Sequence, residues 1–295
     1  MPLKLIVNGY FRSGTTAVWE ALRKSNCNSV VFYEPCHEKL PLILDVVSDE
    51  EDILHGKKLW NEYFENGIFS SVIRKVHPNL GVVYPSESRK VLDYIDIYNE
   101  LESNVILQTN RWHEYLYDIH KEYGAVVVHL IRNPVDIYAS FEESLFKNRN
   151  GFSKIKSYIL RYVFFEDVFY VNETFYFLKR RTAKGELKYR GFKRKICLIF
   201  HSRFEKFMYA WILYNYQAFV DCKRIGGHVA IYEELGQGKL TNYFNLIGYD
   251  FDEVLLKPKR VVFITDDEVC RLSVVADKIG LLSEFKYILK EINSL

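Results

Sequence analysis

This sequence lacks any cysteine pattern typical of a metal site or of a disulfide framework. The 295 residues include five cysteines, an odd number, and no two of them stand in a C-x-x-C spacing. Disulfide frameworks need paired cysteines and zinc sites need close spacings, so we expect neither, and we predict no metal site.

Long apolar runs are absent as well. No stretch reaches the roughly 20 apolar residues that a membrane-spanning helix needs. The first apolar run begins at Leu3, so no signal-peptide pattern precedes it. The expectation is a cytoplasmic protein without a transmembrane segment.

Net charge is small, with 40 basic and 38 acidic residues giving a formal charge of +2. Any attraction for anions must therefore come from local clusters rather than from the whole protein. The length suits one large α/β domain with insertions.

The segment Gly9–Thr16 has the features of a phosphate-binding loop. It follows a short apolar run that predicts a buried strand, and it precedes a helical pattern from Thr15 to about Lys24. Backbone N–H groups at the start of a helix bind anions. The spacing fits G-x-x-x-x-G-K-[ST] except that Thr15 replaces the lysine, and Arg12 is placed to supply the missing charge. A glycine turn without a ligand is the alternative.

A second anion site is predicted in mid-chain. Residues 125–131 form an apolar, β-branched run typical of a buried parallel strand, and Arg132 follows at its carboxyl end. Asn133 and Pro134 then predict the N-cap and first position of a helix, with Ser140 two turns further on. Arg132 and Ser140 are candidates to face one phosphate.

These two stretches resemble the sulfotransferases that use 3′-phosphoadenosine 5′-phosphosulfate (PAPS). The sequences are RSGTT at 12–16 and LIRNPVDIYAS at 130–140, and the first is closer to the carbohydrate and tyrosylprotein branches than to the small-molecule branch. In that family the first motif binds the 5′-phosphosulfate, and an Arg and a Ser eight positions apart bind the 3′-phosphate. The resemblance implies that PAPS is bound by Arg12, Ser13, Gly14, Thr15, Thr16, Arg132 and Ser140.

The resemblance also implies a fold. We expect a three-layer α/β protein with a P-loop-type parallel sheet flanked by helices, forming one domain over residues 1–295. An insertion or lid over the active-site edge is predicted at about 142–203. Within it, residues 179–195 contain nine basic side chains and one acid, which suits an anionic sugar polymer or closure over PAPS; a solvated loop is the alternative. No nucleic-acid-binding motif is present, so no nucleic-acid partner is expected.

A glutamate after the second predicted strand is the candidate base. The strand covers residues 29–33, and Pro35 forces the chain out of the sheet just beyond Glu34. In the carbohydrate and tyrosylprotein sulfotransferases, a glutamate at this place removes the acceptor's proton. His37 is the alternative base because of its intrinsic pKa, and Arg12 would offset charge during transfer. The structural alternative is that Glu34 pairs with an arginine or caps a helix.

The third predicted strand, residues 104–109, ends near the reaction centre. Small-molecule sulfotransferases carry a lysine on this strand and a catalytic histidine at its end, and here Gln108 and Asn110 stand at those places. Arg111 and His113 are candidates for acceptor binding or for stabilising charge on the sulfuryl group.

The predicted function is transfer of a sulfuryl group from PAPS to a hydroxyl or amine of an acceptor, with a carbohydrate or glycolipid as the preferred class. No predicted strand ends in a clear metal-binding aspartate, so no Mg²⁺ is required. Two alternatives stay open: a nucleotide-dependent kinase or NTPase with a degenerate phosphate loop, and a non-catalytic nucleotide- or carbohydrate-binding protein.

Overall fold

The computed structural model describes residues 2–25, 28–45, 58–65, 67–83, 85, 87–146, 202–251, 258 and 262–295. They belong to two compact units, one made of Met1–Arg132 and Gln217–Phe263 and the other of Asn133–Tyr216 and Ile264–Leu295. The predicted insertion at 142–203, with its basic segment, lies almost wholly outside the described residues. A single domain over 1–295 with that insertion stays a prediction.

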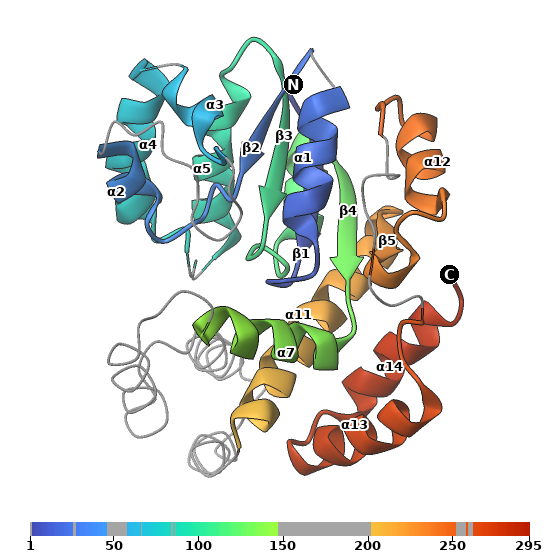
Figure 1. Cartoon of the computed structure of the whole chain (residues 1–295). Helices are drawn as coiled ribbons and strands as arrows, with labels where there is room; N and C mark the ends of the chain where they lie inside the picture. Colours follow the sequence, from blue (N-terminus) through green and yellow to red (C-terminus); the bar gives the residue numbers. More distant parts are fainter. Residues whose placement is uncertain are drawn as a thin grey trace. The chain divides into compact units, whose positions relative to one another are not determined.

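The first unit is built on a five-stranded sheet with the order β2-β3-β1-β4-β5 (Figure 1). Every neighbouring pair is parallel, and the predicted α/β fold with a parallel sheet flanked by helices is confirmed. The strands are β1 (Leu3–Gly9), β2 (Ser29–Tyr33), β3 (Asn104–Thr109), β4 (Val126–Ile131) and β5 (His228–Ile231). Their apolar, β-branched residues are almost all buried, as a sheet covered on both faces requires.

Helices surround this sheet. The helix after the phosphate loop, α1 (Thr15–Ser25), packs against β1, β2 and β3. The others in the first unit are α2 (Leu40–Asp45), α3 (Asn61–Phe64), α4 (Gly67–Leu80), α5 (Ser88–Asn99), α6 (Leu116–Tyr123), the end of α11 (Arg203–Ile225), the 3₁₀ turn η1 (Tyr232–Glu234) and α12 (Lys239–Leu246). Pro78 lies in the last turn of α4.

Aromatic packing fixes the end of β2, where the candidate base follows. The ring of Phe32 contacts Tyr63 and Tyr98 edge to face at centroid distances of 4.9 and 5.1 Å. The Tyr63 hydroxyl donates a hydrogen bond of 3.0 Å to the carbonyl of Tyr33. The Tyr94 hydroxyl donates one of 2.8 Å to the carbonyl of Pro35. The backbone on both sides of Glu34 is therefore held by buried tyrosines.

The second unit is helical in its described part. It holds α7 (Pro134–Phe146), the beginning of α11, α13 (Asp266–Lys278) and α14 (Leu282–Ile292). The predicted start of α7 is confirmed, because Asn133 Oδ1 accepts hydrogen bonds from the amides of Val135 and Asp136 at 2.7 and 3.3 Å. None of the helices in the described ranges is long and apolar enough to cross a membrane.

Candidate active site

Strand register brings the predicted site residues of the first unit to one edge. Gln108 of β3 lies opposite Val7 of β1 and Tyr33 of β2. Gly9, the last residue of β1, lies opposite Leu130 of β4. Because the strands are parallel, the segments that follow them all leave at the carboxyl edge of the sheet, where open α/β folds bind ligands.

The phosphate loop is a tight turn that only glycine fits at two positions. A Cβ on Gly9 would lie 2.6 Å from Ser13 Oγ, and a Cβ on Gly14 would lie 2.4 Å from the ring of Tyr232. Gly14 also has a φ of 93°, a backbone conformation that costs other residues about 1–2 kcal/mol. The Ser13 amide and hydroxyl both donate to the carbonyl of Tyr10, which closes the turn ahead of α1.

Replacing Gly14 by alanine is expected to destabilise the protein by about 2 kcal/mol or more, because backbone strain adds to the clash with Tyr232. Urea unfolding measures the change. Gly124→Ala is the matched control, since Gly124 also has a positive φ of 65° but a Cβ there meets nothing within 4 Å. If both variants lose the same stability, the packing of Tyr232 on the loop is not as described.

Arg132 lies against the phosphate loop, and its predicted role in binding a phosphate stays a prediction. Its Nη1 donates a hydrogen bond of 2.9 Å to the carbonyl of Arg12, and its guanidinium stacks over the Tyr232 ring at 4.4 Å from the centroid. The two motifs, 120 residues apart in sequence, are thus in direct contact. Ser140 lies half-buried in α7 of the second unit, and its sharing of a phosphate with Arg132 stays a prediction.

Glu34 occupies a constrained turn. The residue is only 8% exposed. Its backbone amide donates a hydrogen bond to Gln108 Oε1 at 3.2 Å, and its backbone carbonyl accepts one from the His37 amide at 2.9 Å. Among the described residues, Glu34 (φ 37°) and Arg12 (φ 66°) are the non-glycine positions with positive φ. Such strain concentrates at functional sites, and both positions were predicted from sequence to be catalytic.

Asn110 joins the candidate base to the phosphate loop. Its Nδ2 donates to Glu34 Oε1 at 2.5 Å, and its Oδ1 accepts hydrogen bonds from Gln108 Nε2 at 2.8 Å and Thr15 Oγ1 at 3.0 Å. The sequence identified Asn110 only as the replacement for a histidine. Its contacts assign it a second role, because one amide fixes both the carboxylate and the first residue of α1.

The two threonine hydroxyls of the loop are engaged within the protein. The Thr15 hydroxyl donates a hydrogen bond to Asn110 Oδ1, and the Thr16 hydroxyl shares one of 3.0 Å with the Tyr33 hydroxyl. Contact between these hydroxyls and a bound donor stays a prediction. In general, backbone amides at the start of a helix bind anions directly.

Arg111 supplies positive charge close to Glu34. The side chain is 7% exposed, and its guanidinium lies 5.3 Å from the ring centroid of Phe11 in the phosphate loop. Burial raises the pKa of the Cys36 thiol to about 11, while Arg111 opposes this rise and Glu34 adds to it. The thiol therefore stays protonated beside both charged groups.

His113 and His37, the two predicted histidines, both make local contacts. His113 is 2% exposed, and its Nδ1 lies 2.6 Å from the carbonyl of Arg111, so this nitrogen carries the proton. His37 packs against Trp60, and its Nδ1 accepts a hydrogen bond from the Lys39 amide. The role of His113 in acceptor binding stays a prediction, and so does the role of His37 as the base.

A third histidine, His77, lies near Arg111 and was not predicted. Burial, and then the charge of Arg111, lower its pKa from 6.5 to about 4. Between pH 6.5 and 4, the His77 imidazole is therefore mostly protonated in the unfolded chain and mostly neutral in the folded protein. Stability is expected to fall by about 3 kcal/mol as the pH drops through this window, and to change no further from this group below pH 4.

Urea unfolding of wild-type protein and His77→Gln at pH 7.5 and 4.5 measures this contribution. The variant should lose less stability between the two pH values than the wild type does. An equal loss in both proteins would contradict a neutral buried imidazole at this position.

No protein-family model matches the chain. An uncharacterised protein of Archaeoglobus fulgidus is 26% identical over an alignment of 313 positions, which covers 95% of this chain and 95% of that protein. Among solved structures, the sulfotransferase domain of the Synechococcus PCC 7002 olefin synthase is 14% identical with a TM-score of 0.44, covering 99% of this chain and 94% of that one.

Proposed function

We propose that this protein is a sulfotransferase that moves a sulfuryl group from PAPS to a hydroxyl or amine of an acceptor. The observation that carries the proposal is the hydrogen bond between Arg132 Nη1 and the carbonyl of Arg12. It joins the two motifs that resemble the phosphosulfate and 3′-phosphate sites of sulfotransferases. If the two motifs resembled those sites only by chance, there would be no reason for them to lie in contact at the same edge of the sheet.

The donor would be held by main-chain and arginine groups. The amides of Gly14 to Thr16, which lead into α1, would bind the 5′-phosphosulfate, with the Arg12 side chain adding charge. The Ser13 amide would join them by exchanging its hydrogen bond to the carbonyl of Tyr10 for one to the ligand. Arg132, with Ser140, would hold the 3′-phosphate. PAPS supplies the activated sulfuryl group, and the absence of a lysine at position 15 disfavours the triphosphate of ATP or GTP.

The acceptor would lose its proton to Glu34. The carboxylate is held by Asn110 Nδ2, and it would take the proton of the acceptor's O–H or N–H as the bond to sulfur forms. Arg111 and Arg12 would offset the negative charge on the transferred group and on the leaving phosphate. The groups that would remove the proton and stabilise the charge thus all lie at the carboxyl edge of the sheet.

The acceptor class is proposed to be a carbohydrate or glycolipid. Two features support it: the RSGTT form of the loop, which is closer to the carbohydrate branch, and the basic segment at 179–195. A small alcohol and a peptide tyrosine are the competing acceptors.

Transfer of ³⁵S from labelled PAPS tests the proposal. The acceptor panel would hold a desulfated glycosaminoglycan, a galactolipid, a tyrosine peptide and a phenol, with a thermal-shift comparison of PAPS and ATP–Mg²⁺. Label on the polysaccharide or glycolipid is expected. Stabilisation by ATP alone would favour the kinase or NTPase, and stabilisation by PAPS without any transfer would favour the non-catalytic binder.

A further inference from the structure

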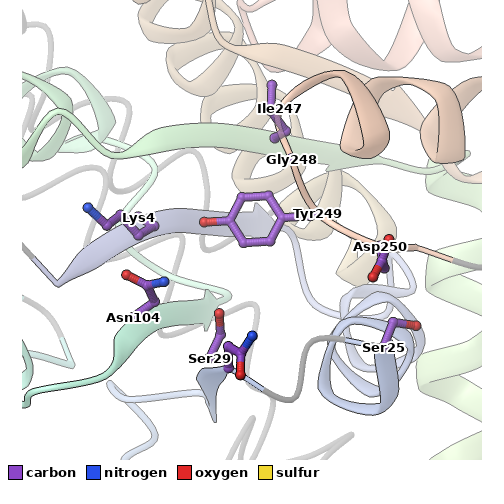
Figure 2. A pocket seen from close by; sticks show the side chains of 9 residues that line it. Lys4, Ser25, Ser29, Asn104, Ile247, Gly248, Tyr249 and Asp250 are labelled. Carbon is purple, nitrogen blue, oxygen red and sulfur yellow. The ribbon is translucent and has the colours of Figure 1, made fainter.

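A polar pocket lies at the amino edge of the sheet, opposite to the phosphate loop. It is lined by Lys4, Ser25, Asn28, Ser29, Asn104, Ile247, Gly248, Tyr249 and Asp250 (Figure 2). Ser29 and Asn104 begin β2 and β3 and lie opposite each other in the sheet, and Lys4 is the second residue of β1. The seven residues of β1 separate this pocket from the phosphate loop by about 20 Å.

The end of α12 places an aromatic ring in the pocket. Gly248 has a φ of 83° and reverses the chain after the helix, and the Tyr249 amide donates to the carbonyl of Phe244 at 2.9 Å. Figure 2 shows the Tyr249 side chain extending from this segment toward Lys4. Burial raises the pKa of the phenol to about 12. The ring therefore stays neutral and offers a flat apolar face with a hydroxyl at its tip.

The polar groups of the pocket suit a neutral ligand. Lys4 and Asp250 carry opposite charges, so the lining has no net charge to favour a phosphate or nucleotide. Asn28 and Asn104 each present a donor and an acceptor, as sugar hydroxyls require. Ile247 is the one aliphatic side chain in the lining, which disfavours a purely apolar ligand.

We infer that this pocket is a saccharide-binding site, separate from the transfer site. Its volume of about 340 Å³ is at the small end of ligand pockets, which span roughly 300–1,000 Å³, and suits one or two sugar rings. The flat face of Tyr249 packs against the C–H face of a pyranose, while the amides and the Ser29 hydroxyl bind its hydroxyl groups. This inference does not depend on the sulfotransferase proposal.

Amide NMR of the full chain tests the site with methyl glucoside, N-acetylglucosamine, lactose and cellobiose as probes. At least one is expected to bind at millimolar concentration and to shift the amides of residues 4, 28–29, 104 and 247–250. Tyr249→Ala should weaken binding about fivefold or more, the scale of a lost aromatic contact. Asn104→Ala should weaken it as well, whereas Asn79→Ala, an exposed asparagine on α4, should not.

Inorganic phosphate is the competing probe. If phosphate shifts these amides and none of the four sugars does, the pocket is an anion site and the inference is overturned. It is also overturned if the sugars shift only amides elsewhere, or if Tyr249→Ala binds them as the wild type does. Thermal stabilisation by PAPS, measured on the same variants, reports separately on the donor site and on correct folding.

Discussion

Replacement of Glu34 by glutamine is expected to lower kcat for sulfuryl transfer about 10²–10⁴-fold, the usual contribution of a general base. Glutamine keeps the shape of the side chain and its amide oxygen still accepts the hydrogen bond from Asn110. It cannot take a proton from the acceptor. Because Glu34 does not form the anion sites, affinity for the desulfated product, 3′-phosphoadenosine 5′-phosphate, should stay within about threefold of the wild type.

Two further variants test whether the loss of activity is specific to the Glu34 carboxylate. Glu38→Gln removes a carboxylate four residues later that is exposed to solvent, and it should leave kcat unchanged. Glu34→Asp keeps a base but moves it back by one methylene, so it should retain more activity than Glu34→Gln. If Glu34→Gln and Glu38→Gln are equally active, another group removes the proton, and His37 becomes the next candidate.

Replacement of Asn110 by aspartate is expected to change the pH dependence of transfer as well as its rate. The variant loses the Nδ2 donor that holds Glu34 and places a second carboxylate beside it. Like charges disfavour ionisation, so the pKa of Glu34 should rise in the variant. The base is then protonated up to a higher pH, and the acidic limb of the kcat profile should move toward higher pH, with kcat lower by about 10²-fold.

A purely structural role for Asn110 would lower activity without moving this limb. Asn110→Ala separates the two effects, since it removes the hydrogen bonds without adding charge and should lower kcat with a smaller change in the profile. Asn79→Asp adds the same charge at an exposed place on α4 and should behave as the wild type. A shift of the acidic limb toward lower pH in Asn110→Asp would contradict the contact with Glu34.

The strands and the motifs were readable from the sequence because their signals are local. The strand predicted at 29–33 and the one at 104–109 match β2 and β3 at both ends, since each is an apolar run bounded by polar residues or a proline. The start of α7 could be predicted from Asn133 and Pro134, because an N-cap residue followed by a proline is also a local signal. By contrast, α6 and α12 have eight residues each, too few for a clear helical period.

The links between the site residues were not readable, because they depend on strand pairing. Glu34 and Asn110 are 76 residues apart, and only the register of β2 against β3 brings them together. The positive φ of Glu34 and Arg12 is likewise imposed by the tertiary structure, since neither residue type favours that conformation. The stacking of Tyr232 on Gly14 and Arg132 follows from the place of β5 at the sheet edge, which no spacing in the sequence encodes.

The most direct test of the central claim is calorimetric binding of 3′-phosphoadenosine 5′-phosphate and 5′-AMP to wild-type protein and to Arg132→Ala. The two ligands differ only in the 3′-phosphate, and charged hydrogen bonds contribute about 1.5–3 kcal/mol each. The wild type should bind the bisphosphate at least about tenfold more tightly than 5′-AMP, and Arg132→Ala should remove most of this difference. Equal affinity of the wild type for the two nucleotides, or a preference unchanged in Arg132→Ala, would contradict a donor site formed by the phosphate loop and Arg132.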